Sequence, residues 1–286
     1  MLTIAFDGIA YGMLLFVLAS GLAVTLGLMN FVNLAHGSFA MAGGYITVIL
    51  ANRVGIPFFA CLPLAFIATA IIGLVFERTL YVHVYRKSHL DQVLFTIGLV
   101  LMSVAALDFF LGSGQVFVRI PEVLQGQINV FGVGIGRYRL LIIVICGLLT
   151  ILLQFVLSKS RFGSRLRAAV DDSRVASGLG INVGRLFSIT FAVGSGLAGL
   201  GGALGVEILG MDPTFPLKFM IYFLIVVTVG GTSSIFGPFV ASLVLGIGDV
   251  AGKYYLPTLG SFIIYTIMLV MLIWRPQGLF ARASPR

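Results

Sequence analysis

Apolar runs follow one another along almost the whole chain, and no other feature of the sequence restricts the fold as strongly. A bilayer core of roughly 30 Å is crossed by about 20 apolar residues in a helix, and lipid offers no partner for unpaired backbone groups. The sequence therefore predicts nine membrane-spanning helices, although Gly-rich connectors leave eight or ten open. The predicted spans are 8–27, 36–52, 58–77, 92–111, 139–157, 187–207, 218–233, 237–253 and 258–274.

The composition predicts an all-α polytopic membrane protein with one transmembrane domain, residues 1–286. Hydrophobic residues make up 59% of the chain and charged residues 10%, whereas soluble domains have roughly 25% charged residues. The start of the chain has no basic leader and no small-residue cleavage site, so its first run is expected to be a retained span. Cys61 and Cys146 lie inside apolar runs without the spacing of a metal site, which predicts packing roles.

Charge in the loops predicts the orientation of the chain. The net charge of +8 is carried between apolar runs, which favours contact with anionic lipid and argues against nucleic-acid binding. If 158–186 faces the cytoplasm, twelve Lys and Arg residues lie on that side and six on the other. This predicts an external N-terminus and a cytoplasmic C-terminus. The external loop 112–139 carries three arginines against the trend, and its alternating run QINVFGV favours a hairpin or a surface helix.

The segment 158–186 is the only long stretch with the pattern of a water-exposed helical unit. Six basic residues and two acidic ones alternate there with small and apolar residues. A short helix over 172–179, roughly 12 Å long, is predicted because Asp171 or Asp172 can accept its first amide protons and Gly178 or Gly180 can end it. On the residues alone, a basic loop at the membrane and a docking site for a soluble partner are equally favoured.

Two stretches, 27–45 and 229–239, interrupt the apolar pattern with polar residues and glycine. Such stretches at corresponding positions of two halves are typical of broken helices in an internal inverted repeat, where unwound backbone lines a water-filled path. The alternative is a tight turn at the cytoplasmic face, and the sequence favours the two equally. Gly194, Ala198 and Gly202 recur at four-residue spacing, which predicts close helix packing.

Three acidic residues, Asp108, Glu207 and Asp249, lie in or near predicted spans. Each is close to a span end from which it can reach the interface, so structural roles are favoured over functional ones. The chain has no phosphate-binding loop, no paired catalytic carboxylates in an aqueous segment and no Cys/His ligand set. We therefore expect neither a metal nor a cofactor in this chain.

Five stretches carry a likeness to a known family: NLAHGSFAMAGGY (33–45), TIGLVLM (96–102), SRFGSRLRAAVDDSRVASGLGINV (160–183), VGGTSSIFGPF (229–239) and RPQGLF (275–280). In order and spacing they resemble the permeases of branched-chain amino acid ABC importers, above all the smaller, H-type membrane subunit of the leucine/isoleucine/valine system. Two departures exist. Ser233 and Ser234 replace a usual glycine and serine, and GGY at 43–45 stands where GAY is common.

This resemblance implies a heterodimeric pore in a bacterial inner membrane, formed with a second, related permease. It further implies two cytoplasmic ATPase subunits, which would hold ATP and Mg²⁺, and an extracytoplasmic solute-binding protein, so that this chain is not itself an enzyme. By position, 165–180 corresponds to the loop that contacts an ATPase. The implied coupling residues are Arg165, Arg167, Ala168, Asp171, Asp172, Arg174, Ala176, Leu179 and Gly180.

The substrate implied by the resemblance is a branched-chain amino acid, and similar sequences also serve urea, short amides or aromatic acids. A solitary carrier or channel is a weaker alternative because few acids lie within the spans, and a membrane enzyme would need a reactive cluster that the sequence lacks. We hypothesise that polar residues of the two interrupted stretches line the substrate path. These residues are Asn30, Asn33, His36, Ser38, Thr228, Thr232 and Ser233.

Overall fold

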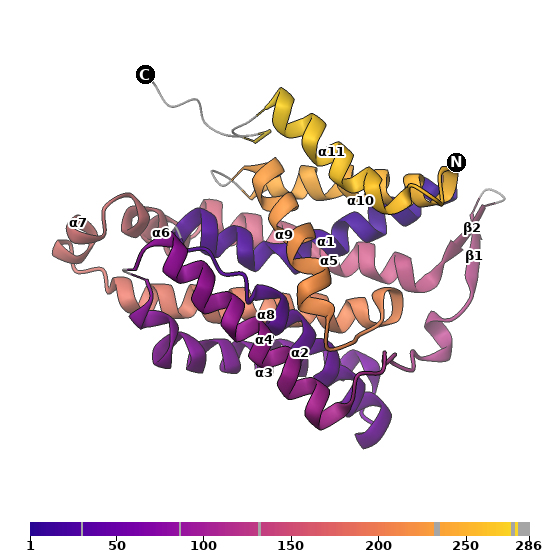
Figure 1. Ribbon diagram of the computed structural model, residues 1–286, viewed down its shortest axis with the longest axis horizontal. Coiled ribbons are helices and arrows are strands. Elements are labelled where there is room, and N and C mark those ends of the chain that lie inside the picture. The colour runs from indigo at the N-terminus through magenta and orange to yellow at the C-terminus, as the bar shows by residue number, and fades with distance from the viewer. Residues whose placement is uncertain (30, 86, 131–132, 232–234, 276–277, 280–286) are drawn as a thin grey trace.

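The computed structural model consists almost entirely of helices (Figure 1). It describes residues 1–29, 31–85, 87–130, 133–231, 235–275 and 278–279. The α-helices in this part of the chain are α1 (Leu2–Met29), α2 (His36–Val48), α3 (Phe58–Thr79), α4 (His89–Leu111), α5 (Arg137–Lys159), α6 (Arg161–Asp171), α7 (Ser173–Gly178), α8 (Val183–Leu209), α9 (Phe215–Gly230), α10 (Phe236–Tyr255) and α11 (Gly260–Trp274). A π-helix (Ile49–Val54), two 3₁₀ turns (Tyr81–His83, Glu122–Leu124) and strands β1 (Gln127–Val130) and β2 (Val133–Gly136) are the remaining elements.

Each of the nine predicted spans coincides with an α-helix. Six of the described helices, α1, α3, α4, α5, α8 and α10, are long and apolar enough to cross a membrane. The apolar parts of α9 and α11 are shorter, and α2 has 13 residues before the π-helix continues it. The all-α polytopic class is therefore confirmed, whereas the count of nine complete spans is not.

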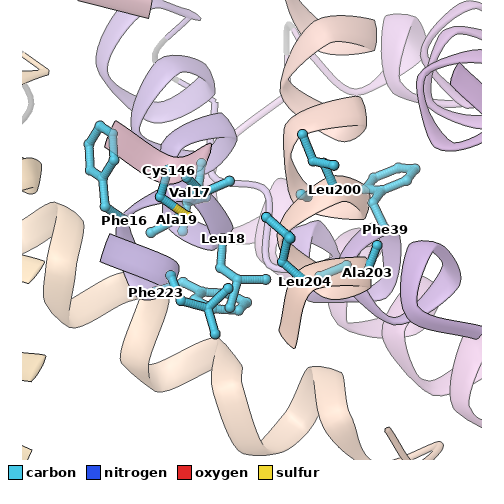
Figure 2. Packing of buried hydrophobic residues seen from close by; sticks show 14 of the residues in the cluster. Phe16, Val17, Leu18, Ala19, Phe39, Cys146, Leu200, Ala203, Leu204 and Phe223 are labelled. Atoms are coloured by element: carbon cyan, nitrogen blue, oxygen red, sulfur yellow. The ribbon is translucent and has the colours of Figure 1, made fainter. Parts of the chain in front are cut away.

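Helices α1 and α8 form the centre of the molecule and are buried along most of their length. They pack antiparallel, since Gly21 of α1 lies against Gly194 while Leu14, nearer the start of α1, lies against Gly205. Figure 2 shows side chains of α1, α2, α8 and α9 meeting in this core, with Cys146 among them. Both cysteines are buried and unpaired, as their predicted packing role requires.

Small residues bring α2 close to α8. Gly202 packs on the carbonyl group of Ala40, and Gly43 packs on the backbone of Gly199. Because apolar burial gives helices little drive to associate in lipid, such close approach supplies van der Waals contact instead. The packing role predicted for the small residues of 194–202 is confirmed.

Helices α1 to α4 and α8 to α11 form two halves with the same order of elements. In each half, a long central helix is followed by a short turn, a shorter helix and a second long helix. Helix α10 packs antiparallel on α1, and α3 packs antiparallel on α8 in the same way. Since α1 and α8 are themselves antiparallel, the two halves form an inverted repeat, as the sequence predicted.

The structure corrects which segments of the two halves correspond. The sequence pattern pairs 27–45 with 229–239, but the turn before α2 (31–35) matches the turn before α9 (210–214). The stretch 229–239 falls instead at the junction of α9 and α10, where residues 232–234 lie outside the described part of the chain. The prediction was wrong because the 210–214 turn is short and looks like an ordinary interface loop.

The β1–β2 hairpin and α7 lie at opposite ends of the longest axis of the molecule (Figure 1). The antiparallel pairing of Gln127 with Gly136 and of Val130 with Val133 confirms the hairpin alternative for loop 112–139. Among the described residues, six acids accompany six bases at the hairpin end, whereas nine bases accompany four acids at the α7 end. The bases at the α7 end are Arg78, Lys87, Lys159, Arg161, Arg165, Arg167, Arg174, Arg185 and Arg275.

Candidate coupling segment and translocation path

Two short helices, α6 and α7, form a unit at one end of the molecule, which we call the α6–α7 segment. The Ser160 hydroxyl caps α6 by accepting a hydrogen bond from the N–H of Gly163 at 3.2 Å. Asp172 caps α7, because its Oδ1 accepts from the N–H groups of Arg174 and Val175 at 2.9 and 3.0 Å. The predicted cap is thus confirmed, whereas helix α6 lies outside the predicted helix 172–179.

A small apolar core holds α6 and α7 to the beginning of α8. Its buried members are Leu166, Ala169, Ala176 and Leu186. One predicted coupling residue, Ala176, therefore holds the segment together and does not face outward. The other eight are exposed: Arg165, Arg167, Ala168, Asp171, Asp172, Arg174, Leu179 and Gly180.

The outer edge of α7 presents two apolar side chains to the surroundings, and we call them the α7 knob. Val175 is 58% exposed and Leu179 is 77% exposed. Gly180 follows with a φ of +83°, a left-handed conformation that lets the chain turn back toward α8. Since exposed Arg174 is next to Val175, the tip combines apolar surface with positive charge.

The α6–α7 segment is anchored firmly to α5. The Arg167 guanidinium donates a hydrogen bond to the Leu157 carbonyl oxygen near the end of α5, and Gly163 packs directly on the Leu157 backbone. Arg165 and Arg174, by contrast, form no ion pair within the described residues. Arg167 therefore fixes the segment, and the charges of the other two are available to a partner.

Glu77, near the end of α3, is a structurally important residue that the sequence pattern does not single out. It is buried, and it accepts hydrogen bonds from the Ser188 hydroxyl at 2.6 Å and from the Tyr85 hydroxyl at 3.2 Å. A buried carboxylate thus joins α3 to the first turns of α8. The available signal was an acid at the end of an apolar run, but the adjacent Arg78 gave it the pattern of an interface residue.

Replacing Glu77 by alanine is expected to destabilise the protein by about 1–3 kcal/mol, because the two hydroxyls lose a buried acceptor. Glu77→Gln keeps one acceptor oxygen and should cost less. The measurement is the temperature at which the detergent-solubilised protein loses its monodisperse elution peak. An alanine variant as stable as the wild type would contradict the bonding role.

Two of the predicted path residues, Asn33 in the turn before α2 and His36 at its first position, are buried and bonded within the protein. The Asn33 side-chain oxygen accepts from the Tyr81 hydroxyl at 3.1 Å. The His36 Nε2 lies 2.8 Å from the Leu18 carbonyl oxygen, and a carbonyl only accepts, so Nε2 carries the proton. Because Leu18 lies midway along α1, α2 begins inside the molecule, which is the geometry of a broken helix.

The two remaining described path residues are more accessible. The Ser38 hydroxyl lies 2.7 Å from that of Ser103 on α4, and both side chains line a cavity of about 210 Å³. Thr228 is exposed on the last turn of α9, where its hydroxyl donates to the Leu224 carbonyl at 2.7 Å. Three predicted path residues lie outside the described part of the chain: Asn30, Thr232 and Ser233.

The starts of the two shorter helices meet inside the molecule. Gly37 of α2 packs on Pro216 of α9, and the rings of His36 and Phe223 lie edge to face with centroids 6.2 Å apart. The N-terminal end of a helix carries partial positive charge. Two such ends therefore point into the interior between the halves, an arrangement found in transporters with broken helices.

The turn before α9 is held by Asp212 at the hairpin end. Burial raises the pKa of its carboxyl, but hydrogen bonds from Lys218 and Thr214 outweigh burial, so the pKa lies below its usual 3.8. The Lys218 ammonium is 2.6 Å from Asp212 Oδ2. A depressed pKa stabilises the folded state above the usual pKa, and this stability is lost as the pH falls through the folded value.

We therefore expect the wild type to lose stability in that acid range relative to Asp212→Asn, which removes the titrating group. Thermal melts of both proteins between neutral and acid pH provide the measurement. Parallel melting curves across the whole range would contradict the contribution of Asp212.

Comparison with known proteins gives a consistent result. A family model described as "Branched-chain amino acid transport system / permease component" matches residues 4–272. The LivH high-affinity branched-chain amino acid transport system permease protein of Escherichia coli K12 is 27% identical, covering 97% of this chain and 94% of LivH. A probable LivH of Methanocaldococcus jannaschii is 29% identical, covering 95% of this chain and 90% of its own.

A second type of permease protein also matches. LivM of Escherichia coli K12, likewise described as a high-affinity branched-chain amino acid transport system permease protein, is 25% identical, covering 96% of this chain and 69% of LivM. No solved structure matches the chain significantly.

Proposed function

The chain belongs to the family of branched-chain amino acid transport permease components, and from this membership we propose that it is the membrane subunit of an ATP-driven importer for branched-chain amino acids. Its multi-pass helical body carries the permease role. The proposal adds the energy source, the direction and the substrate. Because LivH and LivM relatives both match this chain, we infer that its companion in the pore is a second, related permease.

The exposed α7 knob is the feature that best supports an ATP-driven mechanism. Val175 and Leu179 stand exposed on a helix that projects from one end of the molecule. The adjacent Arg174 can contact acidic groups around an apolar groove on a partner. An ATPase subunit that grips this knob would move α5 and α8 together, because the α6–α7 segment is bonded and packed to both.

The orientation of the chain in the membrane is inferred from the distribution of charged residues. An excess of bases marks the cytoplasmic side of a membrane protein, and the α7 end has that excess among the described residues. We therefore infer that the α7 end is cytoplasmic and that the N-terminus and hairpin are external. The hairpin end would then receive the solute-binding protein, and the ATPases would bind ATP and Mg²⁺ at the other end.

The proposed motion uses the inverted repeat. Rigid movement of α8 against α1 would open the interior toward one side and then the other, as in other alternating-access transporters. Helix α3 would move together with α8, because the Glu77 carboxylate accepts a hydrogen bond from Ser188. Chemistry takes place only on the ATPases, and this chain transmits their movement.

The test is co-purification followed by uptake. The tagged full-length chain is expressed with its neighbouring genes, purified in mild detergent and examined for ATPase subunits. The complete system should take up radiolabelled L-leucine in an ATP-dependent way. Transport by the chain alone, driven by an ion gradient in ATP-free liposomes, would contradict the proposal.

A further inference from the structure

A second cavity, of about 600 Å³, opens at the hairpin end and is lined by α1, α8, α9, α10, α11 and the start of α5. We call it the outer cavity. Its wall contains two carboxylates, three cationic side chains, three tyrosines and a phenylalanine among aliphatic residues. None of its lining residues was among the predicted site residues.

The two carboxylates of the outer cavity, Asp7 of α1 and Asp249 of α10, lie within apolar spans. Each uses only one oxygen in an ion pair: Asp7 Oδ2 binds Arg139, and Asp249 Oδ2 lies 2.6 Å from the ammonium of Lys253. The other oxygen, Oδ1, of each carboxylate is buried and has no hydrogen-bond partner among the described residues. Asp249 as a whole is 1% exposed. Buried acceptors without donors are unfavourable, so these oxygens indicate a missing donor.

The cationic side chains of the outer cavity are more exposed to solvent than the Asp249 carboxylate. The side chains of Arg139, Lys218 and Lys253 are about half exposed, whereas the Asp249 carboxylate is buried. A lysine ammonium has three N–H donors. Lys218 and Lys253 each form one ion pair, so each ammonium can donate further hydrogen bonds. The cavity thus combines unsatisfied acceptors at depth with spare donors nearer its mouth.

Close packing of α1 and α10 places the two acids in one wall. Gly8, next to Asp7, lies so close to Ile247 that an added Cβ would be 2.6 Å from the Ile247 Cα. Tyr11 and Phe219 add aromatic surface beside the acids, and the Lys253 ammonium lies 5.8 Å from the centre of the Tyr11 ring.

We propose that the outer cavity binds the zwitterionic head of an α-amino acid. Asp249 and Asp7 accept hydrogen bonds from its ammonium group, and Lys253 and Lys218 bind its carboxylate. The aromatic and aliphatic wall receives the apolar side chain. A simple anion would meet two carboxylates and a simple cation would meet three bases, so only a ligand with both charges is complementary to both sets of groups. This inference rests on the proposed function and names where the substrate first binds to this subunit.

The test uses the transporter assembled from this chain and its companion subunits, held in nanodiscs without the binding protein, and tritiated L-leucine as the probe. Asp249→Asn should weaken leucine binding about tenfold or more, because a charged hydrogen bond is lost. Asp108→Asn is the matched control, since Asp108 is an exposed carboxylate on α4 outside the cavity, and it should bind leucine as the wild type does.

A charge swap separates ligand binding from structural pairing. Asp249→Lys combined with Lys253→Asp restores the ion pair one turn along α10 but moves the carboxylate away from its buried position. We expect the swap to restore thermal stability without restoring leucine binding. Restored binding would reduce the pair to a structural role and overturn the proposal.

Competition for leucine binding to the wild-type transporter tests the zwitterion site even where a variant fails to assemble. Leucinamide lacks the carboxylate and 4-methylpentanoate lacks the ammonium, so both should compete at least about tenfold more weakly than leucine. Equal competition would overturn the zwitterion site. Failure of the complete wild-type system to take up leucine would instead refute the proposed function. Wild-type leucine affinity of Asp249→Asn in the nanodiscs without the binding protein, in a system that takes up leucine, would refute the site alone.

Discussion

Replacing Gly43 by alanine is expected to cost about 3 kcal/mol or more of folding stability and to leave little assembled protein. A Cβ at this position would fall on the backbone of Gly199, where α2 crosses α8. Neither backbone can move aside, because both helices are buried in the core. The inverted halves meet at this crossing, so the clash would also separate the start of α2 from the centre of the molecule.

Gly98→Ala is the matched control, since Gly98 lies inside α4 and an added Cβ would meet no atom of the described residues within 4 Å. Alanine is the better helix former by about 1 kcal/mol, so this variant should be as stable as the wild type or more stable. Membrane yield and the thermal midpoint in detergent are the measurements. The same chemical change should therefore destabilise the protein at Gly43 but not at Gly98, and a stable Gly43→Ala protein would show that α2 and α8 do not pack in this way.

Two aspartates on the α7 knob are expected to uncouple the permease without unfolding it. In Val175→Asp with Leu179→Asp, both changed side chains already face outward, so the thermal midpoint should stay within a few degrees of the wild type. An ATPase groove that receives apolar side chains would have to bury two unpaired charges. Leucine uptake and co-purified ATPase should both fall by at least about tenfold.

Val123→Asp provides the control for this uncoupling, because Val123 is 75% exposed and belongs to the loop at the hairpin end. It should retain its ATPase partners. If the double knob variant also keeps its ATPase and its uptake, the α7 knob is not the coupling element. Ala176→Asp is unsuitable for this test, since Ala176 is buried between α6, α7 and α8 and its replacement would disrupt the segment itself.

Several features were predictable because their cause is local in the sequence. Lipid leaves backbone groups no partner outside the helix, so a long apolar run fixes a helix almost regardless of what packs on it. The cap at Asp172 and the turn at Gly180 depend on residues within one turn of themselves. The hairpin of loop 112–139 follows from alternation in its own few residues.

The candidate site was predictable only in part. Asn33 and His36 were chosen for their polarity inside an apolar stretch, yet their partners, Tyr81 and Leu18, are 48 and 18 residues away. Polarity marks a position that needs a partner, and it does not say whether the partner is protein or substrate. The role of these two residues in transport stays a prediction.

The sequence by itself determined that the apolar runs form helices and that a basic segment lies between α5 and α8. Only the tertiary structure decided that Glu77 bonds to Ser188, 111 residues away, and that Asp7 shares a cavity with Asp249. The physical reason is that spans in lipid are apolar on every side, so their pattern does not reveal which face turns inward. That choice depends on where glycines let two backbones touch, and it alone decides which acids become buried neighbours.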